Sequence, residues 1–212
     1  MDIGIIGSGN IGATVARLAV DAGHTVTIAN SRGPHTLQAL VEDLGDSARA
    51  GTVEDAAAAP DLVLIAIPLR AYTDLDAAPF AERIVLDAGN YYPNRDGRIA
   101  ALEEGTVGSS ELVAHEWLPG ARVVKAFNTI YFKDLGARAD RDADSGDRVA
   151  VPVAGDDADA KQTVVVPFIE SLGLAPVDIG GLAAGRDIQP GAEVYATTLT
   201  PTQLRAALEV DT

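Results

Sequence analysis

The sequence predicts an α/β fold, a doubly wound and mostly parallel sheet with a short C-terminal extension. Short runs of β-branched and aliphatic residues recur along the 212-residue chain, and longer stretches with an apolar period near 3.6 lie between many of them. The short runs carry few polar residues, which is typical of strands that helices cover on both faces. Strands that alternate with helices indicate βαβ units, and therefore parallel pairing.

Eight strands are predicted, with boundaries that hold to about 3 residues. They lie at 2–6, 24–29, 48–51, 61–67, 83–87, 121–126, 147–153 and 174–178. Helices are predicted at 10–22, 34–44, 52–58, 109–117 and 156–172, and a short terminal helix at 201–208. The polar segment 136–147 is predicted as a surface loop. No repeat or linker divides the chain, so we expect one domain that spans residues 1–212.

Local signals support three of these helices. An apolar stripe on the first helix is predicted to pack on the sheet; it consists of Ile11, Val15, Leu18 and Ala19. Thr52 and Asp156 stand where helix N-caps are expected. Asp157 and Lys161 have the i,i+4 order that stabilises an exposed helix.

Composition excludes several classes of function. With 31 acidic and 16 basic residues the formal charge is −15, which disfavours nucleic acid and anionic membrane surfaces as partners. The absence of cysteine excludes disulfides, thiolate catalysis and cysteine-ligated metals. The three histidines are scattered, so no metal site is expected. A strand at residues 2–6 leaves no room for a signal peptide, and the run at 62–69 is too short to cross a bilayer, so we expect a cytoplasmic chain.

The strongest local motif is the Gly-x-Gly-x-x-Gly sequence Gly7, Ser8, Gly9, Asn10, Ile11 and Gly12. It follows a predicted strand and opens an amphipathic helix, which is the context of a Rossmann-type dinucleotide site. Gly7 permits the tight turn, Gly9 lets a pyrophosphate approach the backbone, and Gly12 lets the helix pack closely on the strand. Amides at the helix N-terminus would then face the phosphates. The sequence therefore predicts a dinucleotide-binding domain.

The end of the second strand indicates which dinucleotide is bound. Folds specific for NAD place Asp or Glu there, on the 2′-hydroxyl of the adenosine ribose. Here the strand continues into Asn30, Ser31 and Arg32, with no carboxylate. A guanidinium suits a phosphate dianion, so NADP(H) is the predicted cofactor.

Three later strand ends are predicted to face the same ligand, because ligands in open α/β sheets bind outside the carboxyl ends of the strands. The candidate cofactor-binding residues there are Ile67, Pro68, Ala88 and Asn90. The candidates for the reacting rings are Asn128, Thr129 and Ile130. These positions are neutral, and strand alternation is expected to place Lys125 on the side of Phe127, opposite Asn128. A neutral surface favours a flat heterocycle over a charged acid.

No His–carboxylate or Ser–His pattern predicts acid–base or nucleophilic catalysis. A hydride transfer between two flat coenzymes needs positioning and little else. Two other readings stay open. One is a sensor or regulatory subunit that binds NADPH without turnover. The other is a small-ketone or imine reductase whose site a second subunit completes.

Five blocks of sequence resemble the NADPH-dependent coenzyme F-420 reductases and the related reductase domain of the STEAP metalloreductases. They are residues 7–12, 30–32, 125–130, 155–157 and 181–186, and their order and spacing span nearly the whole chain. The resemblance implies a homodimer and reversible hydride transfer between NADP(H) and a deazaflavin at the strand ends.

One position departs from the family pattern. Family members that reduce the deazaflavin carry His where this chain has Asn128, while Thr129 and Ile130 match. The metalloreductase-like members keep Asn there but depend on a haem-bearing membrane domain. The resemblance therefore implies NADP(H) with either coenzyme F-420 or a flavin as the acceptor.

Overall fold

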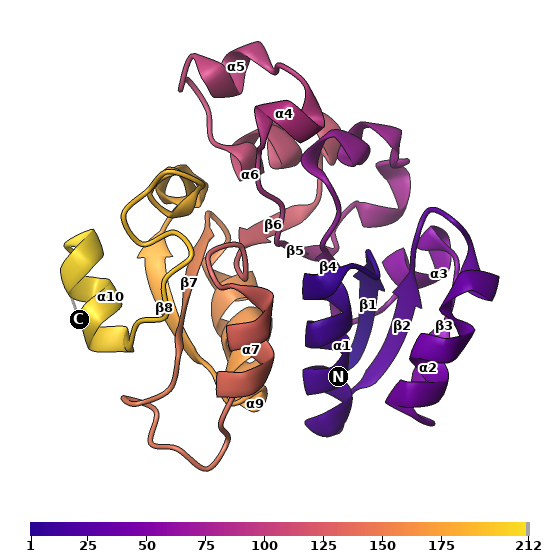
Figure 1. The fold of residues 1–212 in the computed structure, drawn as a ribbon. Coiled ribbons are helices and arrows are strands. Elements are labelled where there is room, and N and C mark those ends of the chain that lie inside the picture. Colours follow the sequence, from indigo (N-terminus) through magenta and orange to yellow (C-terminus); the bar gives the residue numbers. More distant parts are fainter. Residues whose placement is uncertain (211–212) are drawn as a thin grey trace.

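The computed structural model describes residues 1–210 and places eight strands in one sheet, in the order β3-β2-β1-β4-β5-β6-β7-β8 (Figure 1). The strands are β1 (Asp2–Ile6), β2 (Thr25–Ala29), β3 (Ala48–Ala50), β4 (Leu62–Ile65), β5 (Ile84–Asp87), β6 (Arg122–Lys125), β7 (Ala150–Gly155) and β8 (Ala175–Gly180). All eight predicted strands are confirmed. The last two residues of the predicted 1–212 domain lie outside the described part.

The topology creates a switch point at the centre of the sheet. From β1 the chain moves outward to β2 and β3, and then crosses back to β4 on the other side of β1. Every pair from β3 to β6 is parallel, so the carboxyl ends of these strands share one edge. Because β7 runs antiparallel to β6 and β8 runs parallel to β7, the last two strands point in the opposite direction, and the end of β7 pairs with the end of β6. The predicted mostly parallel, doubly wound sheet is confirmed.

Helices cover both faces of this sheet (Figure 1). Side chains alternate along β4, so that Leu62 and Leu64 join one apolar core and Val63 and Ile65 the other. The helices of the first half are α1 (Asn10–Asp21), the 3-10 helix η1 (Pro34–Leu37), α2 (Gln38–Leu44), α3 (Val53–Ala57), and the 3-10 helices η2 (Leu69–Asp74) and η3 (Ala78–Phe80). The predicted stripe of α1 packs on the first of these cores, with Val15 and Ala19 fully buried.

The second half carries shorter helices. They are α4 (Pro93–Asp96), α5 (Ala100–Glu103), α6 (Ser109–Leu112), the π-helix η4 (Val113–Trp117), α7 (Phe132–Arg138), α8 (Ala158–Ala160), the π-helix η5 (Lys161–Val165), α9 (Val166–Ser171), the 3-10 helix η6 (Leu182–Ile188) and α10 (Pro201–Leu208). Within residues 1–210 no helix combines the length and the apolar character that a membrane span requires.

Three local predictions need correction. The first three residues of the predicted loop 136–147 belong to α7, which ends at Arg138. The N-cap of α8 is Asp157, whose side chain accepts from Ala160 N, whereas Asp156 accepts from Leu182 N. Lys161 does not pair with Asp157, because its ammonium is buried against Asp178 at 2.9 Å. Thr52 is confirmed as an N-cap and forms a capping box with Asp55.

Candidate functional site

The glycine turn between β1 and α1 has the geometry that its three glycines predict. Gly7 has a φ of 112°, and a Cβ there would lie 2.3 Å from Ala66 O. A Cβ on Gly12 would lie 1.8 Å from Gly7 O, so only glycine lets α1 approach the turn this closely. A Cβ on Gly9 would meet no protein atom within 4 Å. Gly9 therefore borders open space, and no side chain caps the first turn of α1.

The loop after β2 is joined to this turn by Asn30. Its amide nitrogen donates to Ser8 Oγ at 3.1 Å and to Thr36 Oγ1 at 3.0 Å. Its amide oxygen accepts from Arg32 N at 2.9 Å. The Asn30 amide is thus already engaged with protein groups and holds Ser8 and Arg32 in place. Arg32 itself is exposed, and within residues 1–210 its guanidinium has no carboxylate partner.

A first cavity, of about 450 Å³, lies between this loop, the glycine turn and the end of β4. The predicted residues that line it are Gly7, Ser8, Gly9, Asn30, Ser31, Arg32, Ile67 and Pro68. Leu75 adds an apolar wall, and Asp74 a carboxylate. The sequence analysis missed both, because they come from the 3-10 segment after β4, which has no recognisable periodicity.

A second cavity, of about 380 Å³, begins at Gly9 and continues over the carboxyl ends of β4, β5 and β6. The predicted residues that line it are Gly9, Asn10, Ile11, Ile67, Pro68, Ala88, Asn90, Asn128, Thr129 and Ile130. The two cavities share Gly9, Ile67 and Pro68 and form one groove across the switch point. Every predicted site residue except Gly12, which packs beneath the turn, lines this groove. Their roles in binding stay predictions.

Asn90 and Asn128 face each other across the ends of β5 and β6. Asn90 Nδ2 donates to Asn128 O at 2.8 Å, and Asn128 Nδ2 donates to Asn90 Oδ1 at 3.2 Å and to Ile188 O at 2.6 Å. Both of the groups that accept from Asn128 Nδ2 are oxygens, which fixes the orientation of the Asn128 amide. Asn128 Oδ1 is consequently buried and has no partner among the described residues.

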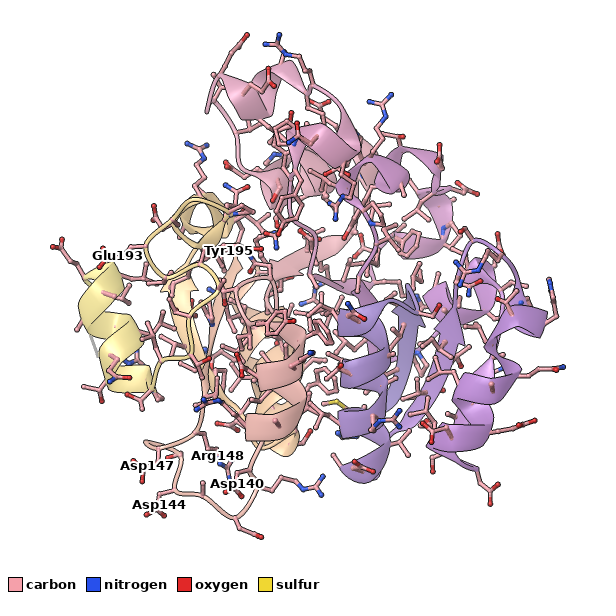
Figure 2. All side chains as sticks on the ribbon, in the orientation of Figure 1. Asp140, Asp144, Asp147, Arg148, Glu193 and Tyr195 are labelled. Atoms are coloured by element: carbon pink, nitrogen blue, oxygen red, sulfur yellow. The ribbon has the colours of Figure 1, made fainter. Side chains whose placement is uncertain are left out.

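Aromatic side chains form the rim of the second cavity. Tyr92 and Tyr131 are among the few large apolar side chains that are exposed in residues 1–210. Tyr195 lies on the loop between η6 and α10 (Figure 2), and its hydroxyl contacts that of Tyr92. Burial and this contact raise the pKa of Tyr195. These tyrosines stand far apart in the sequence, and no motif marks them.

Arg95 is a cation at this rim that the sequence analysis overlooked. Its guanidinium lies 4.8 Å from the centre of the Tyr92 ring and donates to Asn90 O at 2.7 Å. It also pairs with the buried Asp96 carboxylate at 2.9 Å. Burial would raise the pKa of Asp96, but hydrogen bonds from Arg95 and from Tyr92 N lower it overall. The carboxylate therefore balances the charge of Arg95.

Beneath the floor of the second cavity lies a buried polar cluster. Lys125 Nζ contacts Asp87 Oδ2 at 3.2 Å, Gly89 O at 2.7 Å and Ser109 Oγ at 3.2 Å. Asp87 also accepts from the Tyr72 hydroxyl at 2.5 Å, and burial together with this carboxylate raises the pKa of Tyr72. The expected side for Lys125 is wrong, because Phe127 has a φ of 62° and turns into the opposite core.

No cluster of three or more His, Cys, Asp or Glu side chains within residues 1–210 is arranged to hold a metal ion. The second cavity instead offers backbone amides, neutral amides, hydroxyls, aromatic rings and the guanidinium of Arg95. Such groups bind and orient a ligand but supply neither a general base nor a nucleophile.

Comparison with known proteins identifies relatives along most of the chain. Residues 2–91 match the family model described as NADP oxidoreductase coenzyme F420-dependent. The metalloreductase STEAP3 of Rattus norvegicus is 31% identical over 189 residues, which are 88% of this chain and 35% of the relative. The chain thus spans about a third of the length of that curated relative.

Two solved structures have nearly the same extent as this chain. A hypothetical protein from Sinorhizobium meliloti is 36% identical with a TM-score of 0.80, and the match covers 94% of this chain and 96% of that one. A protein from Arthrobacter sp. FB24, provisionally named an F420-dependent NADP reductase, is 25% identical with a TM-score of 0.69, over 88% of this chain and 87% of that one. With the glycine turn inside the matched region, the chain is similar to the coenzyme F420-dependent NADP oxidoreductases and belongs to the NADP-dependent oxidoreductases.

Proposed function

We propose that this chain transfers hydride between NADP(H) and a flat heterocyclic acceptor, a deazaflavin such as coenzyme F-420 or a flavin. The observation that carries the proposal is the continuous groove, whose two cavities meet at Gly9 beside the uncapped N-terminus of α1. This is the switch point at which open α/β sheets bind dinucleotides.

The middle of the groove fits a pyrophosphate. Gly9 leaves the space free, and α1 has 12 residues, which is long enough for its dipole to favour an anion at the N-terminus. Asn10 and Ile11 lie in the first turn of the helix and line the groove. Their backbone amides have no partner within the helix, so phosphate oxygens would satisfy them.

The first cavity fits an adenosine that carries a 2′-phosphate. Arg32 offers a guanidinium that no described carboxylate pairs with, Ser31 offers a hydroxyl, and Asn30 fixes the backbone of the loop that carries both. Asp74 is the opposing feature, since a carboxylate in the same cavity repels a phosphate dianion. We infer that Arg32 decides the preference, because a guanidinium binds phosphate through two parallel hydrogen bonds.

The second cavity fits the nicotinamide together with the acceptor ring. Its floor is neutral and mostly small or apolar, and its rim carries the exposed rings of Tyr92 and Tyr131. Asn128 Oδ1 is a buried acceptor with no partner in residues 1–210, which costs about 1–3 kcal/mol until a donor satisfies it. The carboxamide of a nicotinamide or the N–H of a planar heterocycle offers such a donor.

NADP(H), when bound, supplies the hydride. The chain itself would align the two rings and exclude water from the space between them. Proximity and alignment of this kind are sufficient for a transfer that needs no side-chain base.

Steady-state oxidation of NADPH with coenzyme F-420, FMN, FAD and ferric chelates tests the proposal. We expect turnover with at least one of the ring acceptors and a clear preference for NADPH over NADH. Tight NADPH binding without turnover would instead indicate a sensor. Turnover only with small ketones or imines would indicate a different class of reductase.

A further inference from the structure

Asp87 and Lys125 are fully buried and oppositely charged side chains that lie next to the second cavity but do not line it. They stand at the ends of β5 and β6, where the strand register pairs one residue with the other. Both are 0% exposed, and their charged atoms are 3.2 Å apart. A buried ion pair seldom stabilises a fold more than apolar side chains of the same volume would. Its presence here calls for another role.

The pair acts on the backbone of Gly89. Asp87 Oδ1 accepts from Gly89 N at 2.8 Å, and Lys125 Nζ donates to Gly89 O at 2.7 Å. A Cβ on Gly89 would lie 2.8 Å from Asp87 Oδ1 and 3.2 Å from the Tyr72 hydroxyl, so only glycine fits at this position. The backbone N–H and the carbonyl of Gly89 are therefore both bound by charged side chains, and such hydrogen bonds are stronger than neutral ones.

The next residue in the chain is Asn90, which lines the cavity and exchanges hydrogen bonds with Asn128. A shift of the Gly89 peptide would move Asn90 and, through it, the Asn128 amide. We propose that Lys125 is a positioning residue for hydride transfer. It holds Gly89 in place, and the Asn90–Asn128 pair therefore keeps its position in the floor of the cavity. This inference rests on the function proposed above.

The chain contains a matched control in a second lysine. Lys161 Nζ donates to Asp178 Oδ1 at 2.9 Å and to Gly180 O at 3.1 Å, while Gly180 N donates to the same carboxylate oxygen at 2.9 Å. A lysine, an aspartate and a glycine two positions later thus make the same set of hydrogen bonds in both places. The second set lies at the end of β8, two strands away from β6, where Gly180 pairs with Ala154 and Ala154 pairs with Lys125. None of its described residues lines the groove.

The test compares Lys125→Met with Lys161→Met in single-turnover reduction of the acceptor by bound NADPH. We expect Lys125→Met to slow the transfer about tenfold, as for the loss of one charge-assisted hydrogen bond. The NADPH dissociation constant should stay within about threefold, because the pyrophosphate and adenosine contacts are unchanged. Lys161→Met should keep the wild-type rate within about twofold. Equal slowing in both variants, or in neither, overturns the proposal.

A double-mutant cycle identifies the route of the effect. If Lys125 acts through Asn128, adding Lys125→Met to Asn128→Ala should slow the transfer no further than Asn128→Ala does alone. If the rate reductions of the two single variants multiply in the double variant, Lys125 acts elsewhere, which also overturns the proposal.

Lys125→Met leaves the Asp87 charge buried and unpaired, so the variant Lys125→Met with Asp87→Asn removes that cost. We expect this pair to regain thermal stability while the transfer stays slow. A rate that recovers together with stability, or a fold lost in both variants, assigns the pair to stability alone and overturns the proposal. A wild-type chain that reduces no acceptor would instead remove the proposed function, and this inference with it.

Discussion

Asn90 and Asn128, 38 residues apart in the sequence, exchange hydrogen bonds across the ends of β5 and β6: the Asn90 side chain donates to Asn128 O, and the Asn128 side chain donates to Asn90 Oδ1. This pair forms a neutral floor for the second cavity, and among the described residues the buried Asn128 Oδ1 has no partner. Two charged groups hold the pair from opposite sides. Lys125 binds Gly89 O from the interior, and Arg95 binds Asn90 O from the rim.

Asn128→Ala should lower turnover with a deazaflavin or flavin acceptor while the NADPH dissociation constant stays within a few-fold. The substitution removes the unpaired oxygen and the bonds to Asn90 and to Ile188 O, but none of the phosphate contacts. One lost hydrogen bond predicts a fall in rate of about tenfold. Stopped-flow reduction and NADPH titration on the same variant provide the measurement.

Asn128→His is the complementary change, because it introduces the residue that the similar deazaflavin reductases carry at this position. We expect higher activity with coenzyme F-420 and no gain with FMN. Unchanged acceptor kinetics in both the Ala and the His variants would place the acceptor outside the second cavity.

Arg32→Ala should weaken the binding of NADPH by about 1.5–3 kcal/mol, the range for hydrogen bonds to charged groups. The binding of NADH should barely change. The matched change in the same cavity is Asp74→Asn, which removes the opposing carboxylate and should strengthen NADPH slightly. Calorimetric titration of both nucleotides measures both effects. Equal losses of affinity for NADPH and for NADH in the Arg32→Ala variant would show that Arg32 does not contact the 2′-phosphate.

Gly9→Val should abolish dinucleotide binding in a chain that still folds, since a Cβ there meets no protein atom within 4 Å and the side chain enters the space assigned to the pyrophosphate. Gly146→Val is its control, because that glycine also has open space around it but lies outside the groove. Circular dichroism confirms folding, and NADPH titration measures binding. A folded Gly9→Val variant with wild-type affinity would contradict the assignment of this turn.

Asp157→Asn should lower the free energy of unfolding at pH 7 by no more than about 1 kcal/mol, because the pair with Arg122 is partly exposed. Asn keeps the N-cap of α8, so the change isolates the charge. The hydrogen bonds from Arg122 hold the folded pKa of Asp157 at about 2, below its ordinary value of 3.8. A depressed folded pKa stabilises above the unfolded value and loses this effect as pH falls through about 2. The free energies of unfolding of the wild-type and Asp157→Asn chains, measured in urea, should therefore converge between pH 5 and pH 2. A difference that stays constant over this range would refute the pairing.

The strands and the glycine turn could be predicted because their signals are local. An apolar run such as residues 62–65 defines a buried strand by itself, and Gly7, Gly9 and Gly12 stand within six positions. The predicted residues at three separate strand ends converge because parallel strands share one edge, so topology supplied their proximity.

The rest of the site depends on contacts that sequence periodicity does not encode. Tyr92 and Tyr195 are 103 residues apart and meet only because the loop before α10 returns to the cavity. Arg95 lies in α4, a proline-initiated helix of four residues that is too short to show a period. The antiparallel direction of β7 likewise leaves no mark in an apolar strand. Phe127 takes a positive φ, which reversed the expected side of Lys125.

The central claim is that hydride passes directly between two rings held in the second cavity. The most direct measurement uses NADPH that carries deuterium at the transferred position of the nicotinamide, together with oxidised coenzyme F-420 in ordinary water and without oxygen. The account predicts that the deuterium is recovered on a ring carbon of the reduced deazaflavin, because the hydride never leaves the cavity. Reduced deazaflavin that carries only hydrogen from the solvent would contradict it.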